Sequence, residues 1–139
     1  MTIVHPAREV YRSAPAGAAA ARAFVVDQAH AADLPGGLVE DLALAASELA
    51  TNAIRHGTHA TNGGAFTVSS EVIDGHAAVR VDNPGPSPIS IPNGPRMPGV
   101  DAEGGRGLAI LRDLGAHVDI APGGVTASFD LARYSACER

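Results

Sequence analysis

The sequence predicts an α/β (α+β) sandwich of two layers, in which helices cover one face of a mixed, mostly antiparallel sheet. Three observations predict it: helical apolar periodicity in the first half of the chain, strand patterns that follow one another as hairpins, and glycine-containing turns between them. Strands joined by tight turns lie antiparallel, so a parallel βαβ array is not expected. The 139 residues suffice for one domain with its own hydrophobic core.

The first predicted helix covers residues 15–32 and is rich in alanine. Ser13 followed by Pro15 is typical of a helix start, because proline is tolerated in the first turn. The helix is expected to end before Pro35-Gly36-Gly37, since proline and glycine both interrupt helical structure.

The second predicted helix, residues 38–56, has the clearest pattern in the chain. Its apolar residues, among them Leu38, Leu42 and Leu49, recur at spacings of three and four. Gly57 stands where glycine commonly ends a helix. One side of this helix is therefore expected to be buried.

Four strands are predicted, in two hairpins. Residues 65–70 and 72–81 are assigned to the first hairpin, with Asp74-Gly75 as the tight turn between them. Residues 117–120 and 125–131 are assigned to the second hairpin, around a Pro-Gly-Gly turn. The hairpins account for the antiparallel character of the predicted sheet.

A third, short helix is predicted over residues 107–114, ended by Gly115. Before it, residues 83–104 hold six of the ten prolines, which fit neither a helix interior nor a central strand. A segment of this length is long for a connection in a compact domain, which leaves a functional lid or disorder as interpretations. We place the lid at about residues 86–104 and expect it to be mobile without ligand.

The charge balance excludes some classes of function. Ten positive side chains face fifteen negative ones, which gives a net charge of −5 at pH 7. Nucleic-acid binders usually carry the opposite imbalance, so no direct nucleic-acid partner is expected. All ten positive residues are arginines, so a phosphate loop that depends on lysine is excluded.

The chain is expected to be a single cytoplasmic domain without a membrane partner. It contains no apolar run long enough to span a membrane and no signal-peptide pattern. Cys137 is the single cysteine, so no internal disulfide can form, as is usual in a reducing compartment. The predicted organisation is an N-terminal segment (1–14), one domain (15–131) and a C-terminal tail (132–139).

Glu48, Asn52 and His56 recur every four residues on the second helix, so they project from one side of it. A carboxamide oxygen can ligate Mg²⁺, and a carboxylate can accept a proton from an attacking hydroxyl or water. The alternative is a polar stripe on a half-exposed helix, because this spacing alone is common. His56 and His59 form a weak metal pattern without a third ligand, and His56 more simply complements the helix dipole.

Two further segments combine glycine with polar residues. The strand that ends at Asp82-Asn83 is followed by Pro84-Gly85, where the backbone can approach a flat ligand or simply turn. Gly104-Gly105-Arg106-Gly107-Leu108 precedes the third helix, whose amide groups and dipole favour an anion. Each segment alone is weak evidence.

The three segments in this order, joined by the proline-rich stretch, resemble the GHKL or histidine-kinase-like ATPases. Within that superfamily the chain is similar to the short anti-sigma-factor serine/threonine kinases. Ser47-Glu48-Leu49-x-x-Asn52-Ala53-x-x-His56-Gly57 resembles their N box, and Gly104 to Leu108 resembles their G2 box. The resemblance covers roughly residues 15–131.

This resemblance implies a Bergerat-type ATP-binding fold with ATP and Mg²⁺ as cofactors. It implies that Glu48 is the catalytic base and that Asn52 holds Mg²⁺ on the ATP phosphates. The other implied nucleotide-binding residues are His56, Asn83, Gly85, Gly104, Gly105, Arg106, Gly107 and Leu108.

One segment departs from the family pattern. The G1 box runs Val-x-Asp-x-Gly-x-Gly, and alignment on Val81 and Gly85 places Asn83 where its adenine-reading aspartate stands, with Ser87 for the last glycine. The Asn83 amide oxygen can accept the adenine hydrogen bond but supplies no charge. Asp82 is a substitute only if the strand shifts by one residue, which turns the side chain to the other face.

The resemblance implies a kinase that sequesters a sigma factor, phosphorylates an antagonist protein on serine or threonine, and forms a homodimer. A second hypothesis is a catalytically silent protein-binding module of the same fold, which the Asn83 departure favours. A third is an ATP hydrolase in which Glu48 activates water.

Overall fold

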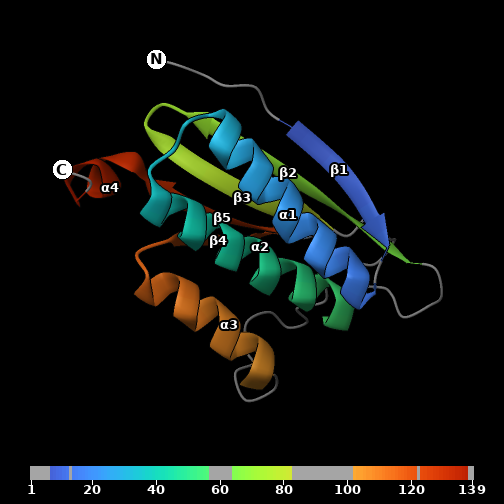
Figure 1. The fold of residues 1–139 in the computed structure, drawn as a ribbon. Helices are drawn as coiled ribbons and strands as arrows, with labels where there is room; N and C mark the ends of the chain where they lie inside the picture. The colour runs from blue at the N-terminus through green and yellow to red at the C-terminus, as the bar shows by residue number, and fades with distance from the viewer. Residues whose placement is uncertain (1–6, 13, 57–63, 83–101, 122, 138–139) are drawn as a thin grey trace.

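The computed structural model of the chain describes residues 7–12, 14–56, 64–82, 102–121 and 123–137. Figure 1 shows the helices α1 and α2 running across the sheet. In chain order the elements are β1 (Ala7–Arg12), α1 (Pro15–Ala31), α2 (Gly36–His56), β2 (Ala65–Ile73), β3 (His76–Asp82), α3 (Ala102–Asp113), β4 (His117–Ala121), β5 (Gly124–Asp130) and α4 (Leu131–Cys137).

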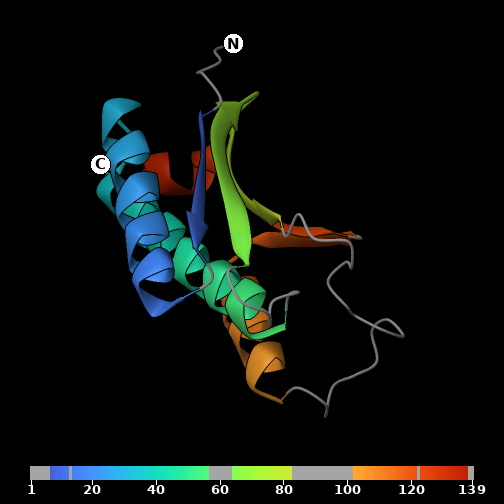
Figure 2. The same ribbon diagram turned by 90° about the vertical axis from the view of Figure 1, so that its right-hand side faces the viewer.

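The described strands form one five-stranded sheet in the order β1-β2-β3-β5-β4, and each neighbouring pair among them is antiparallel. Figure 2 views the sheet from its edge and shows the helices on one side of it. The predicted class, a two-layer sandwich with a mostly antiparallel sheet and helices on one face, is confirmed.

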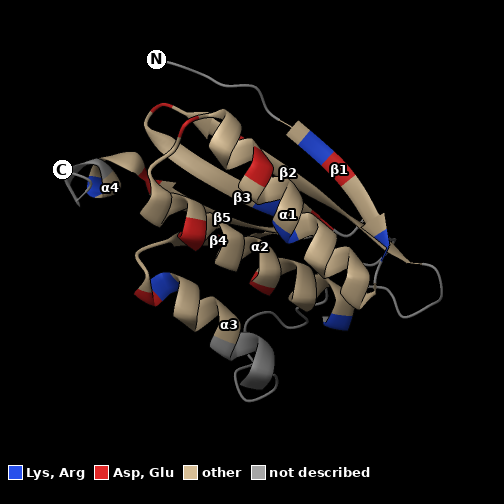
Figure 3. Ribbon diagram, in the orientation of Figure 1, with Lys and Arg blue, Asp and Glu red and all other residues tan. Residues whose placement is uncertain are grey.

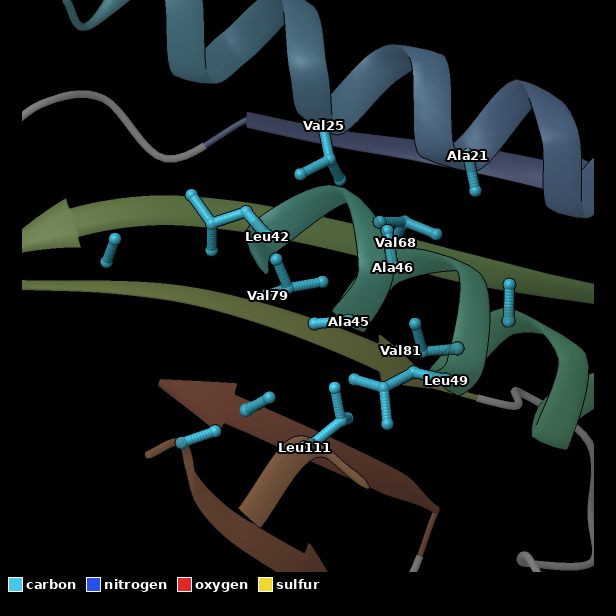
Figure 4. Packing of buried hydrophobic residues seen from close by; sticks show 14 of the residues in the cluster. Ala21, Val25, Leu42, Ala45, Ala46, Leu49, Val68, Val79, Val81 and Leu111 are labelled. Atoms are coloured by element: carbon cyan, nitrogen blue, oxygen red, sulfur yellow. The ribbon is translucent and has the colours of Figure 1, made fainter. Parts of the chain in front are cut away.

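The buried core lies between α1, α2 and the sheet. Figure 4 shows side chains from the two helices and the strands gathered in this layer, with Leu111 of α3 at one end. In α1 the buried residues recur every four positions, as a helix resting on one face requires. They are Gly17, Ala21, Val25 and Ala29. The small alanines allow α1 to lie close to α2.

The two long helices agree with their predicted ranges within two residues. The predicted turn at Asp74 and Gly75 is also present, with positive φ values of 47° and 80°. The hairpin boundary was placed too early, because β2 continues through Val72 to Ile73. The final strand stops at Asp130, and Leu131 is the first residue of α4.

The predicted start of the third helix was also wrong. Helix α3 begins at Ala102, so the glycine segment from Gly104 to Gly107 lies inside the helix and not before it. Its end near Gly115 is as predicted: Gly115 has φ 99°, and the Ala116 amide donates to the Leu111 carbonyl. The predicted lid, residues 86–104, lies mostly outside the described residues, so its expected mobility stays a prediction.

The N-terminal segment contains a strand for which the sequence carried no clear pattern. Strand β1 pairs with β2 along its length, and α1 begins three residues after the last residue of β1. A Cβ atom at Gly17 would collide with the Arg12 carbonyl oxygen, so glycine lets α1 begin beside β1. The Tyr11 ring points into the helix layer, 6.4 Å from Phe24 and 6.0 Å from Phe66 between ring centroids. Burial and the nearby Glu9 raise the pKa of Tyr11.

The C-terminal tail contains helix α4, which ties several elements together. The Asp130 carboxylate accepts a hydrogen bond from the Ala132 amide and so caps the helix. The Tyr134 hydroxyl donates a hydrogen bond to the Asp41 carboxylate of α2 at 2.6 Å. Burial is the larger cause, and this hydrogen bond the second, of a strongly raised pKa of Tyr134. None of the helices described here has the length and apolar character needed to cross a membrane.

Candidate functional site

Helix α2 runs along the centre of the helix layer and carries two of the predicted site residues. Glu48 and Asn52 are both half-buried and lie one helical turn apart, so their side chains leave the same side of the helix. His56 is the last residue of α2, and its side chain is not among those described. The predicted pairing of a carboxylate and a carboxamide on one side of α2 is therefore present.

Packing of the core brings two distant segments, the end of β3 and helix α3, to this part of α2. Figure 4 shows Leu49 of α2 beside Val81 of β3, with Leu111 of α3 next to them, and all three are buried. Glu48 is the neighbour of Leu49, and Gly107 lies one turn before Leu111. The N-box-like helix, the end of β3 and the glycine-bearing helix therefore converge on one place.

Glu48 of α2 lies against Gly107 of α3. Gly107 is buried, and a Cβ atom built on it would collide with the Oε1 atom of Glu48. The same Cβ position lies 3.3 Å from the Glu48 Cδ atom and 3.7 Å from its Cβ atom. The carboxylate thus rests directly on the glycine backbone. No described residue donates a hydrogen bond to this carboxylate or forms an ion pair with it.

The glycine segment differs from the expected loop in what its amides can do. Only the first four N–H groups of a helix lack partners inside the helix. Because α3 begins at Ala102, Gly104 is among these, whereas Gly107 lies further along the helix. An anion at this end would meet the earliest amides of α3. Leu108 is half-buried and packs against the core, so it anchors α3 to the rest of the domain.

Asn83 and Gly85, the G1-like residues, lie outside the described residues, as do the positions from there to residue 101. The surroundings of Gly104 and Gly105 and the side chain of Arg106 are likewise not described, although the backbone of these residues belongs to α3. The predicted roles of these residues, like those of the other predicted site residues, stay predictions.

Asp82, the alternative to the G1 aspartate, lies on the face of the sheet opposite the helices. Along β3 the buried residues Val79 and Val81 face the helices, whereas Arg80 and Asp82 alternate with them and face the other side of the sheet. The Arg80 Nε atom donates to both carboxylate oxygens of Asp82, at 2.8 and 3.0 Å. The Asp82 side chain also rests on Gly124 of β5. Its position and its partner fit a structural ion pair on the open face of the sheet.

The acidic residues Asp41 and Glu48 of α2 lie in different surroundings. Figure 3 shows acidic positions along α2 and an arginine at its C-terminal end. Asp41, in the N-terminal half, is held by Tyr134, whereas Glu48 lies at the α3 contact. Among the described residues, no three His, Cys, Asp or Glu side chains gather in a way that could hold a metal ion.

The fold is a two-layer sandwich with an antiparallel sheet, and α2, β3 and α3 converge at one place in it. Residues 11–130 match the family described as the histidine kinase-like ATPase domain. The match covers most of the chain, and the chain belongs to this family. Membership of an ATPase family implies nucleotide binding.

A solved structure with a similar fold is that of the RsbU and RsbW domains of Rv1364c from Mycobacterium tuberculosis. The TM-score is 0.62, with 21% sequence identity, over 91% of this chain and 31% of that chain. At this identity the similarity shows the fold, and the chain spans about a third of the longer structure. A search of curated proteins finds no match.

Proposed function

We propose that the chain is an ATP-binding regulatory protein of the anti-sigma-factor type. It acts as a serine/threonine protein kinase that sequesters a sigma factor and phosphorylates an antagonist protein. Family membership supports the nucleotide, and the similar Mycobacterium tuberculosis structure includes an RsbW domain. The observation that carries the catalytic part is the Glu48 carboxylate resting on Gly107, free of a partner among the described residues.

The proposed reaction transfers the γ-phosphoryl group of ATP to a serine or threonine hydroxyl. The hydroxyl oxygen forms a bond to the γ-phosphorus, the bond from that phosphorus to the β–γ bridging oxygen breaks, and ADP leaves. Glu48 accepts the hydroxyl proton, which is the role of a general base in phosphoryl transfer. Because no described side chain pairs with it, the Glu48 carboxylate has both oxygens available for that proton.

The side chain that fits Mg²⁺ is that of Asn52. Its amide oxygen is a hard ligand, and its half-buried position one turn from Glu48 faces the same side of α2. Mg²⁺ bound there with the ATP phosphates would neutralise charge on the transferred group. Nucleotide contacts by His56, Asn83, Gly85 and the segment from Gly104 to Leu108 belong to the same proposal.

The protein is also proposed to act as a homodimer in the cytoplasm, where the ATP pool that such a kinase consumes is found. Light scattering on the purified protein, with and without ATP, measures the oligomeric state directly. A monomer in both conditions would remove the dimer from the proposal without affecting the kinase assignment.

A catalytically silent protein-binding module is the second candidate. It is favoured by Asn83 at the adenine-reading position together with the commitment of Asp82 to Arg80, which removes the nearest alternative carboxylate. In that case the fold would hold a partner protein, and ATP would bind weakly or not at all.

Isothermal titration with ATP, in the presence and absence of Mg²⁺, separates the two candidates. The kinase proposal expects binding that depends on Mg²⁺, followed by slow release of phosphate when water replaces the protein hydroxyl. Absence of heat at millimolar ATP would overturn the kinase proposal and leave the binding module in its place.

A further inference from the structure

Gly107 is the one described position in α3 where a backbone lies directly under a proposed catalytic group. The residue is buried, and every side chain other than hydrogen would begin in the space of the Glu48 Oε1 atom. Glycine is costly inside a helix, by about 1 kcal/mol relative to alanine. The contact with Glu48 is a reason for glycine at this place that lies outside α3.

The contact distances show which atoms would have to move if a methyl group were added. The added carbon would lie 3.7 Å from the Glu48 Cβ atom, which is ordinary van der Waals contact. It would lie 3.3 Å from Cδ and would overlap the carboxylate oxygen. The helix backbones of α2 and α3 therefore need not separate. The end of the Glu48 side chain would turn aside instead.

We propose that Gly107 is a positioning residue for Glu48: its missing side chain makes the space in which the carboxylate is held for proton transfer. This inference rests on the proposed kinase function and deepens it. It assigns to Gly107 an effect on the catalytic carboxylate of α2 that is separate from any contact of the glycine segment with phosphate.

The proposal predicts a division between folding and catalysis. An alanine at position 107 improves the helix propensity of α3, and the only atoms it displaces are at the end of a flexible side chain. The fold should tolerate the change. The displaced atoms are those that accept the proton, so the chemical step should slow, since a misplacement of about 1 Å costs up to roughly 10²-fold.

The experiment compares Gly107→Ala, Glu48→Asp and the double variant with the wild-type protein. Aspartate is shorter by one methylene, so its carboxylate leaves the space that the added methyl needs. Gly37→Ala is the matched control, because it also adds a methyl to a helix, at 3.7 Å from the Tyr134 Cδ1 atom and far from Glu48. The measurements are ATP–Mg²⁺ affinity by titration, phosphate release at saturating ATP, and thermal unfolding without nucleotide.

The expected result is that Gly107→Ala lowers phosphate release at saturating ATP by roughly 10- to 100-fold, a larger loss than any loss of ATP affinity that follows from the place of Gly107 in the nucleotide-binding segment. In the Glu48→Asp background the same substitution should cost nothing further. Gly107→Ala should raise the thermal stability more, or lower it less, in the Glu48→Asp background than in the wild-type background. The control Gly37→Ala should leave phosphate release unchanged.

The opposite result is that Gly107→Ala lowers ATP affinity and phosphate release by the same factor. These losses would also be the same in the Glu48→Asp background as in the wild-type background. That outcome would overturn the proposal and assign Gly107 to phosphate binding. If the wild-type protein binds no ATP, or binds it without releasing phosphate, the proposed kinase function fails. The unfolding measurements then still decide the contact, because an effect of Gly107→Ala that is independent of the residue at position 48 would overturn it.

Discussion

Two carboxylates of the molecule each rest on a glycine, and their surroundings differ. Glu48 lies on the helix side of the sheet against Gly107, and no described residue donates to it. Asp82 lies on the open side against Gly124, and Arg80 occupies both its oxygens. A glycine under a carboxylate therefore does not by itself indicate function. The absence or presence of a guanidinium partner decides whether the oxygens are available to a substrate.

The largest expected difference between the two carboxylates is in rate. Glu48→Gln should lower phosphate release by about 10²–10⁴-fold, the usual contribution of a general base, and leave ATP affinity within a few-fold. Asp82→Asn, the matched change on the open face, should leave the rate nearly unaltered. Single-turnover kinetics and titration calorimetry measure the two effects separately. Equal loss of binding and rate in Glu48→Gln would show that Glu48 is structural.

Asn52 sharpens the comparison by testing whether the side of α2 that bears Glu48 is the nucleotide side. Asn52→Ala should remove most of the Mg²⁺-dependent part of ATP affinity, because it removes the hard oxygen ligand. Thermal unfolding without nucleotide should change little, since the side chain is half-buried. Calorimetric titrations with and without Mg²⁺ give the difference. A variant that keeps its full Mg²⁺ dependence would place the metal elsewhere.

Tyr134 tests a third acidic residue, Asp41, which is held by a neutral donor. Tyr134→Phe should destabilise the fold by about 1–2 kcal/mol, because the Asp41 oxygen loses its 2.6 Å hydrogen bond. Burial and Asp41 raise the pKa of Tyr134 above its ordinary value of 10.0. The hydroxyl is protonated in both states below that pH, whereas above it the unfolded chain loses the proton first.

The stability that depends on the Tyr134 proton is therefore fully present below about pH 10 and is lost as the pH rises toward the higher folded-state pKa. Urea unfolding at pH values from roughly 8 to 11 measures the free energy of unfolding of the wild-type protein and of Tyr134→Phe. The quantity of interest is the difference between these two free energies. The difference in free energy of unfolding between the two proteins should become smaller above about pH 10. A difference that stays constant over this range would contradict the assigned hydrogen bond.

The smallest effect is expected at the Arg80–Asp82 pair itself. Its side chains are 43% and 34% exposed, so solvent screens the attraction. Arg80→Gln should cost less than about 1 kcal/mol and less still at high salt. Denaturant unfolding at low and high ionic strength measures this. A large loss independent of salt would mean that the pair holds the β3–β5 register through packing, and that its contrast with Glu48 is not electrostatic.

The regular part of the fold was predictable because local patterns dictate it. The apolar spacing from Leu38 to Leu49 marks α2, and Asp74-Gly75 supplies the positive φ values that a tight turn needs. Strand β1 was not predictable in this way, because its pairing with β2 joins residues that lie far apart in the chain. Helix α4 depends similarly on Tyr134 reaching Asp41, a separation of 93 residues.

The candidate site also has one part that local patterns predict and another part that depends on tertiary packing. The spacing of Glu48 and Asn52 on one helix is a local property, so the sequence was sufficient to place them together. The contact of Glu48 with Gly107 arises only when α2 and α3 pack around Leu111, and no local pattern marks it. The helical start at Ala102 also escaped prediction, because the glycines that follow it disfavour a helix locally.

The strand order has a consequence for how the chain is made. Strand β3 pairs with β2, which precedes it, and with β5, which is the last of the described strands in chain order; β4 pairs only with β5. During synthesis from the N-terminus, β3 must therefore wait for β5 with the backbone N–H and C=O groups of one edge unpaired. An unpaired strand edge is a template for association with other chains. Truncation before Gly124 should leave this edge permanently open and favour aggregation over a smaller folded domain.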